Sequence, residues 1–248
     1  MSGTRRHEGA ALEGMATNGA SAHALLRAVL ARRLGAGRVQ VIALPIDEVL
    51  SLLPLDDAIV AEPLTHGRPL ACTDVRACGK QAREEGRALV VDNSSATFVG
   101  CAAVRLGAHL SVELLGVGEK PATLVGIARD ASRVLPGLAM LDGLPTLPDE
   151  RCQELLDSLP QREASWRAVS DVAQVVASYL ACHPRVKQVR YPGLRSDPSF
   201  EIAARTLTGG FGPWVDYQWE GAAGWVRWEA SPHDDAREAA LALEAALK

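Results

Sequence analysis

Residues 88–113 read ALVVDNSSATFVGCAAVRLGAHLSVE, and they carry the clearest structural pattern in the chain. The stretch opens with a short apolar run, Ala88 to Val91, that ends at Asp92. Such a run is typical of a strand covered on both faces. A helix predicted from Thr73 to Glu85 precedes it, with Thr73 as N-cap and Gly86 as the stop. This alternation of helix and strand indicates an α/β fold with a parallel sheet.

Similar signals predict further elements on both sides of this stretch. Helices are expected over 21–33, 46–53 and 101–106, and strands over 39–44, 58–61, 109–115 and 124–128. Residues 134–147 hold several Pro and Gly residues and are typical of a connection between domains. We therefore expect an α/β domain over 1–147 and a smaller domain over 148–248.

The smaller domain is predicted to be α+β. The pattern predicts helices over 149–158, 163–182 and 199–207, a strand over 186–191, and an antiparallel hairpin of strands 214–219 and 224–228. A last helix follows, for which Ser231, Pro232 and Asp234 are the expected N-cap, N1 and N3 residues.

Composition excludes several classes of function. The chain has 248 residues, of which 48% are hydrophobic and 23% charged, so it is long and apolar enough to bury a core. A net charge of −4 with interspersed signs disfavours nucleic-acid and membrane-surface partners. No apolar run approaches the roughly 20 residues of a membrane span, and the first fifteen residues lack a secretory pattern. The five scattered cysteines form no C-x-x-C pair, so we expect reduced thiols, no metal site and a cytoplasmic protein.

Asp92 is the first candidate functional residue. An acidic residue at the carboxyl end of a buried parallel strand stands where open α/β sheets bind ligands. Asn93 and the run Ser94-Ser95-Ala96-Thr97 follow it and offer hydroxyls and amides for a cofactor ring or a phosphate. The alternative is structural, namely an N-cap for a helix that follows the strand.

Three segments resemble one family in the same order. Residues 88–113 are similar to the strand, turn and helix of the pyridoxal-phosphate enzymes of cysteine and methionine metabolism, which include cystathionine γ-synthases and γ-lyases. Residues 178–221, with His183-Pro184, the Tyr-Pro-Gly-Leu at 191–194 and the Gly-Phe-Gly at 210–212, resemble the start of that family's C-terminal domain, and 224–247 resemble its closing strand and helix. The resemblance implies a truncated aspartate-aminotransferase-like scaffold (fold type I) with a smaller α+β C-terminal domain.

The resemblance also implies a cofactor and roles for particular residues. The family uses pyridoxal phosphate, and Asp92 falls on the aspartate that pairs with the pyridine nitrogen and keeps it protonated. Arg227 falls on the arginine that grips the substrate α-carboxylate. Gly14 and Met15, with Ala16, resemble the turn whose amides hold the cofactor phosphate.

The chain departs from the family pattern at its nucleophile. When Gly107-Ala108 is matched to its family counterpart, Val117 stands where the Schiff-base lysine belongs, and Lys120 lies three residues later. No tyrosine precedes Tyr179, so the ring-stacking tyrosine has no counterpart, and neither has the family's N-terminal arm.

Three functions remain open from the sequence. One is a non-catalytic homologue that acts as partner or regulatory subunit of a complete enzyme, as a homodimer or as a hetero-oligomer with a full-length relative. The second is an active pyridoxal-phosphate lyase or transferase on sulfur amino acids or homoserine esters, with a shifted lysine such as Lys120 or one supplied in trans. The third is a cofactor-free protein that binds an amino acid near Asp92 and Arg227.

Overall fold

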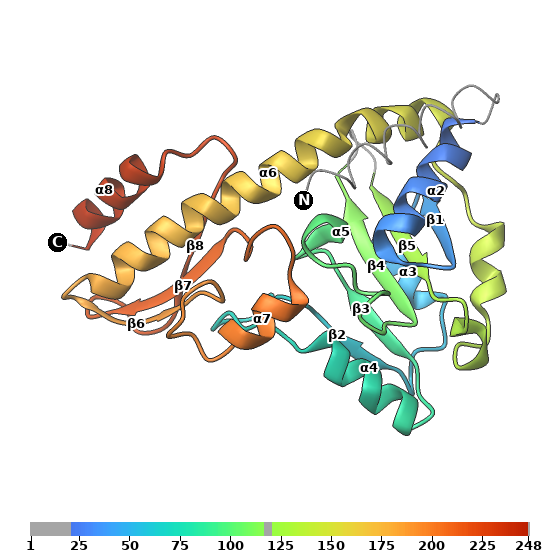
Figure 1. Cartoon of the computed structure of the whole chain (residues 1–248), viewed down its shortest axis with the longest axis horizontal. Helices are drawn as coiled ribbons and strands as arrows, with labels where there is room; N and C mark the ends of the chain where they lie inside the picture. Colours follow the sequence, from blue (N-terminus) through green and yellow to red (C-terminus); the bar gives the residue numbers. More distant parts are fainter. Residues whose placement is uncertain (1–20, 117–120, 248) are drawn as a thin grey trace.

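The computed structural model describes residues 21–116 and 121–247, and it contains two sheets along a single long helix (Figure 1). The larger sheet has the strand order β1-β5-β4-β3-β2. Its strands are β1 (Arg38–Ile42), β2 (Ile59–Ala61), β3 (Leu89–Asp92), β4 (Leu110–Leu115) and β5 (Ala122–Ile127). The smaller sheet has the order β6-β7-β8, with β6 (Val186–Arg190), β7 (Trp214–Trp219) and β8 (Val226–Glu229).

The expected parallel sheet is only partly present. Strands β2, β3 and β4 are parallel, as predicted, whereas β5 runs antiparallel to both β4 and β1. The prediction was wrong for β5 because only residues 116–121 separate it from β4. So short a connection reverses the chain, since a parallel crossover needs a dozen or more residues.

Helices cover both faces of the larger sheet. One face packs against α2 (Ala22–Leu34) and α4 (Val75–Glu84), and the other packs against α3 (Ile46–Ser51). Gly35 ends α2 as its sequence predicts, with a left-handed φ of 69°. Ser21, where the helix was expected to begin, is instead its N-cap and accepts from Ala24 N–H. Both faces of the sheet are thereby largely covered, although Val60 of β2 and Leu114 of β4 stay exposed.

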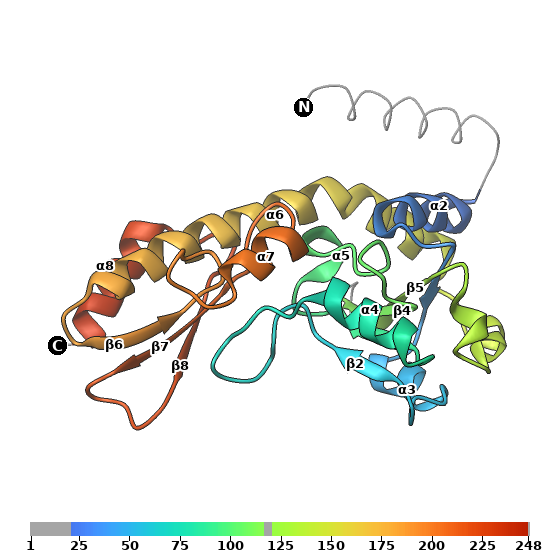
Figure 2. The same cartoon turned by 60° about the horizontal axis from the view of Figure 1, so that its bottom comes forward.

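The smaller sheet is an antiparallel hairpin with one added strand, as predicted. Helix α6 (Asp149–Cys182) packs on it, and α8 (Ala236–Ala246) packs against α6. Helix α7 (Phe200–Thr206) lies between the two sheets, and the loop from β2 to α4 projects toward the hairpin (Figure 2). The boundary near residue 147 stays a prediction.

Four local predictions were wrong. Asp74, not Thr73, caps α4, and Asp235, not Ser231, caps α8. The helix expected over 101–106 is a series of turns, because Cys101 is extended and its carbonyl accepts from the Asn93 amide; the helix there is α5 (Thr97–Gly100). The helices expected over 149–158 and 163–182 are one helix that contains Pro160.

Tertiary packing explains the continuous α6. Pro160 removes one helical hydrogen bond, but buried residues precede and follow it, among them Leu155, Leu159, Trp166 and Val169. Burial of this face on both sides of the proline outweighs the local preference for a break.

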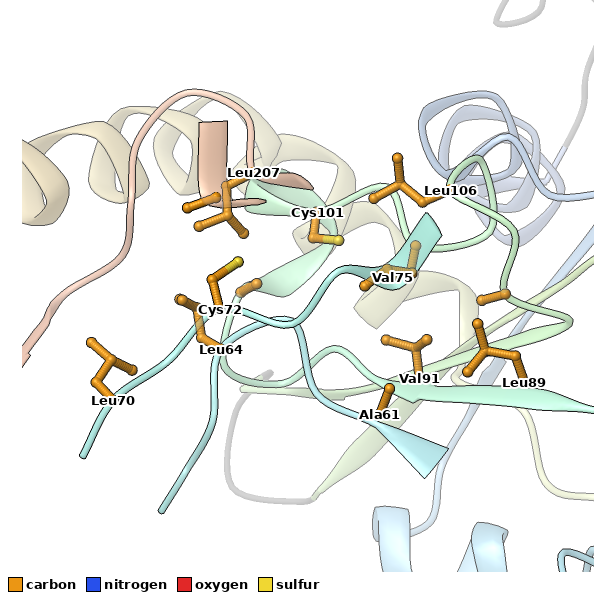
Figure 3. Close-up of a cluster of buried hydrophobic side chains, with 14 of the residues drawn as sticks. Ala61, Leu64, Leu70, Cys72, Val75, Leu89, Val91, Cys101, Leu106 and Leu207 are labelled. Carbon is orange, nitrogen blue, oxygen red and sulfur yellow. The ribbon is translucent and has the colours of Figure 1, made fainter. Parts of the chain in front are cut away.

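One apolar cluster joins the two halves of the chain. It contains Leu89 and Val91 of β3, Leu64 and Leu70 of the loop that follows β2, and Leu207 after α7 (Figure 3). Within the described residues, the helices include none that is both long and apolar enough to cross a lipid bilayer.

Candidate functional site

Asp92 ends β3, between the parallel strands β2 and β4, as its sequence context predicts. It is half-buried, and its Oδ1 accepts a hydrogen bond from Ser94 N–H at 3.0 Å. Its Oδ2 makes no hydrogen bond to any residue that the structure describes. One carboxylate oxygen is thus used to form the turn, and the other is left for a ligand.

The polar run after Asp92 serves the fold. Asn93 is buried and donates through Nδ2 to Cys101 O at 2.9 Å, and Ser95 Oγ donates to Leu64 O at 2.7 Å. Ser94 Oγ accepts from Leu114 N–H at 3.1 Å. The sequence left two interpretations of this run, a ligand site and a helix N-cap. The N-cap of α5 is Ala96, which makes no side-chain cap, and the polar side chains bind backbone groups of the chain. The run fastens the loop to neighbouring backbone.

Glu113 is a candidate residue that the sequence analysis missed. It lies in β4 with only 2% of its surface exposed, and its Oε2 has no hydrogen-bond partner among the described residues. Burial raises its pKa well above the ordinary 4.5 of a glutamate, the charge on Asp92 adds to this, and Phe98 N–H and Arg162 act in the opposite direction. The raised pKa favours the protonated form of this carboxyl, whose charge interacts with that of Asp92. The acidic residue inside the apolar run of β4 was the available signal.

Arg162 of α6 lies beside the end of β4. Its Nη2 donates to Gly116 O at 2.9 Å and its Nε to Ser158 Oγ at 3.2 Å. A cavity of about 340 Å³ opens between α5 and α6, with Thr97, Phe98 and Arg162 among its lining residues. The long helix α6 thus reaches the end of the sheet at which β3 and β4 terminate, where Asp92 lies.

Arg227 lies in β8, and its guanidinium donates four hydrogen bonds to other residues of the chain. Its Nε donates to Asp216 Oδ1 at 2.7 Å and its Nη2 to Asp216 Oδ2 at 2.8 Å. Its Nη1 and Nη2 also donate to the carbonyls of His66 and Gly67, at 2.9 and 2.8 Å. The guanidinium lies over the Trp214 ring, 4.8 Å from the centroid.

These contacts leave little of Arg227 for a ligand. A guanidinium has five N–H donors, and Asp216 binds it in the two-pronged manner of a free carboxylate. The Asp216 side chain is fully buried and that of Arg227 is 11% exposed. The structure links Arg227 to the Asp92 segment only indirectly, because His66 and Gly67 lie in the same loop as Leu64, which binds Ser95.

The remaining predicted site residues lie outside the described residues. These are Gly14 and Met15 of the expected phosphate turn, Val117 at the lysine position, and Lys120. The five cysteines are free thiols as expected, and the described residues include no cluster of three or more side chains suited to a metal ion.

Comparison with known proteins finds one family to which part of the chain is similar. The model of the Cys/Met metabolism PLP-dependent enzymes matches residues 165–227. The chain is 27% identical over 164 residues to a chloroplastic cystathionine gamma-synthase of Nicotiana tabacum, a match that covers 61% of this chain and 29% of that protein. It is 28% identical over 194 residues to a putative cystathionine gamma-lyase of Streptomyces coelicolor, covering 71% and 46%. Residues 165–227 are thus similar to the Cys/Met metabolism family, and the full-chain relationship rests on relatives at 27–28% identity.

Solved structures of family members share the fold. A methionine gamma lyase from Micromonospora echinospora superposes with a TM-score of 0.68 at 17% identity, covering 92% of this chain and 86% of that one. A cystathionine gamma synthase from Xanthomonas oryzae gives 0.70 at 18%, covering 91% and 85%. The fold is therefore the α/β fold of these fold type I enzymes. The chain spans less than half the length of the curated relatives named above.

The described residues supply only part of a site for the family's cofactor. Asp92 has a free oxygen at the strand end, which suits a protonated pyridine nitrogen. The hydroxyls that follow it are bound to backbone, and Arg227 is bound to Asp216. The described part of the site therefore fits the ring nitrogen of the cofactor and does not fit a substrate carboxylate.

Proposed function

We propose that this chain is a non-catalytic member of the Cys/Met metabolism family that acts as a partner or regulatory subunit of a complete relative. The observation that carries the proposal is the Asp216–Arg227 pair. The family resemblance implies that Arg227 binds the carboxylate of the substrate. In this chain Arg227 instead binds the carboxylate of Asp216. A substrate would have to displace a buried, two-pronged ion pair, which costs several kcal/mol.

The sequence supports the same proposal. Matching Gly107-Ala108 to the family places Val117 at the lysine position, and a valine side chain has no amine to attack an aldehyde. The third possibility, an amino-acid-binding protein without cofactor, also relies on Arg227 and loses support from its pairing with Asp216.

An optical experiment tests the loss of catalysis. The chain is purified with added pyridoxal phosphate, and its visible spectrum is recorded before and after borohydride reduction. We expect no aldimine band and no lysine fixed by borohydride. A band that Lys120→Ala abolishes and Lys187→Ala retains would overturn the proposal, since Lys187 is an exposed lysine of β6 and serves as the matched control.

Co-expression tests the partner role. A tagged copy of this chain is expressed with a full-length cystathionine γ-synthase, and the purified species is weighed by sedimentation. We expect a complex that contains both chains, with a changed turnover of the full-length enzyme. An enzyme that sediments alone and keeps its turnover contradicts the partner role.

A further inference from the structure

A second cavity, which shares Phe98, Val99 and Trp166 with the cavity beside Arg162, carries an unusual charge. It measures about 500 Å³ and lies between α2, α6 and the segment after β3. Four arginines line it, Arg32, Arg33, Arg105 and Arg167, together with a single carboxylate, Glu163. The lining groups thus sum to a net charge of +3 in a chain whose overall charge is −4. A concave surface of one sign concentrates counter-ions of the other sign.

Two of these arginines make contacts within the chain that stabilise the fold. Arg33 forms an ion pair with Glu163 across α2 and α6. Arg105 Nη2 donates to the carbonyls of Arg32 and Arg33, at 2.8 and 3.2 Å, and so satisfies the carboxyl end of α2. These contacts explain why Arg33 and Arg105 are present without any ligand.

The other two arginines have no such explanation. The side chains of Arg32 and Arg167 are exposed, and their guanidinium groups make no hydrogen bond or ion pair to any residue that the structure describes. The position of Arg32 in the last turn of α2 is favourable for the helix dipole, but Arg167 lies in the middle of α6. Two unpaired guanidinium groups beside two paired ones repel one another, and an anion between them relieves that repulsion.

One part of the cavity lining is apolar, and it is called the floor here. Phe98 and Trp166 form it, with 4% and 6% of their surfaces exposed, and Val99 and Ala102 lie beside them. Trp166 Nε1 donates to Thr208 O at 3.0 Å, which fixes the orientation of the indole. An apolar floor with a few convergent charged groups is the usual construction of a small-molecule site, and its volume is in the usual range.

We propose that this cavity binds a small organic phosphate that carries a flat heterocycle, as a mononucleotide does. The ring packs on the floor formed by Phe98 and Trp166, and the phosphate binds Arg32 and Arg167. Guanidinium groups match the geometry of phosphate oxygens, and a dianion suits a cavity charge of +3.

Calorimetric titration with adenosine monophosphate tests the proposal, with adenosine and inorganic phosphate as partial ligands. We expect the monophosphate to bind at least about tenfold more tightly than either part. Arg32→Ala and Arg167→Ala should each weaken it about tenfold, as removal of one charged hydrogen bond does. Arg76→Ala, which removes an exposed arginine of α4, is the control and should leave binding unchanged.

Three outcomes would overturn the proposal. The first is no binding of adenosine monophosphate, and the second is equal affinity in the wild type and both variants. The third is inorganic phosphate as tight as the nucleotide, which would exclude a role for the floor. Thermal melting of each variant accompanies the titrations, and because both side chains are exposed we expect unchanged melting temperatures. Self-association that Arg32→Glu and Arg167→Glu abolish, without nucleotide binding, would make the cavity an interface between copies instead.

Discussion

Asp216 and Glu113 are both buried acidic residues, but the chain surrounds them differently. Asp216 receives three hydrogen bonds, two from Arg227 and one from Leu70 N–H at 2.6 Å. Glu113 has an oxygen with no partner among the described residues. Burial is costly for a charged carboxylate unless a countercharge offsets it, so the first is held in an ion pair, whereas burial raises the pKa of Glu113.

Removing the charge of Asp216 should destabilise the fold strongly. Asp216→Asn leaves the guanidinium of Arg227 buried without its countercharge, and we expect the free energy of unfolding to fall by about 3 kcal/mol. Urea denaturation measures this. The control is Glu220→Gln, whose carboxylate lies 3.8 Å from Arg185 in an exposed pair and should change stability by less than about 1 kcal/mol. Equal effects of the two variants would contradict the role of Asp216.

The pH dependence of stability should report the state of Glu113. Below about pH 4.5 it is protonated in both the folded and the unfolded chain. Above that pH the unfolded chain releases the proton, whereas the raised pKa in the folded chain retains it. The free energy of unfolding therefore falls as pH rises toward the folded pKa, by up to about 1.4 kcal/mol per pH unit for this group.

Glu113→Gln should remove this loss while it keeps the shape of the side chain. We expect the variant to exceed the wild type in stability by more at pH 8 than at pH 5, as measured by urea denaturation at both pH values. Glu229→Gln, in an exposed position of β8, should show no such difference. A gap between wild type and Glu113→Gln that is the same at both pH values would mean that the carboxyl is ionised in the fold.

At the scale of elements, one residue joins the first turn of α6 to the first turn of α2. Asp149, the first residue of α6, accepts hydrogen bonds from the backbone N–H groups of Ala22 and His23 in the first turn of α2, at 3.1 and 3.0 Å. A carboxylate at a helix N-terminus satisfies free donors and complements the dipole. Asp149 is far from Ala22 and His23 in sequence, so no local sequence pattern could predict this cap.

Asp149→Ala should therefore loosen α2. We expect a loss of about 1–2 kcal/mol in the free energy of unfolding, the usual effect of removing a helix cap. Glu150→Ala, at the exposed neighbouring position, should have a much smaller effect. Hydrogen exchange adds a local measurement, because faster exchange in the first turn of α2 is expected only for Asp149→Ala. Unchanged exchange there would show that the cap contributes nothing.

At the scale of the whole molecule, the two sheets are fastened by several contacts. The loop after β2 binds Arg227 through the carbonyls of His66 and Gly67, and Asp74 at the start of α4 pairs with Arg205 of α7 at 2.7 Å. Leu207 packs into the same cluster as Leu89 and Val91 (Figure 3). Shared burial of this kind couples the unfolding of the two halves.

We therefore expect one unfolding transition. Leu207→Ala should lower the free energy of unfolding by about 2–4 kcal/mol, because it leaves a cavity in a buried cluster. Far-ultraviolet circular dichroism and tryptophan fluorescence should shift together. Leu241→Ala, which alters a side chain with 59% exposure on α8, is the control and should change little. Two separate transitions would indicate independent domains on either side of residue 147.

The sequence was a good guide to most elements and a poorer guide to their ends. The apolar run before Asp92, the Gly35 stop of α2 and the hairpin of β7 and β8 all stand where local pattern placed them. Pro160 and the 101–106 segment were misjudged, because distant packing and the Asn93 amide decided them. Local signals report backbone preference, and tertiary contacts override it where much surface is buried.

The candidate site divides in the same way. The order of motifs along the chain indicated the family resemblance, the fold class and the place of Asp92 at a strand end. Only the tertiary structure revealed that Arg227 binds Asp216, that Glu113 is buried, and that arginines from α2, α6 and the 98–105 segment meet in one cavity. The physical reason is that charge pairing and burial depend on distances between residues far apart in sequence, and no local pattern encodes those distances.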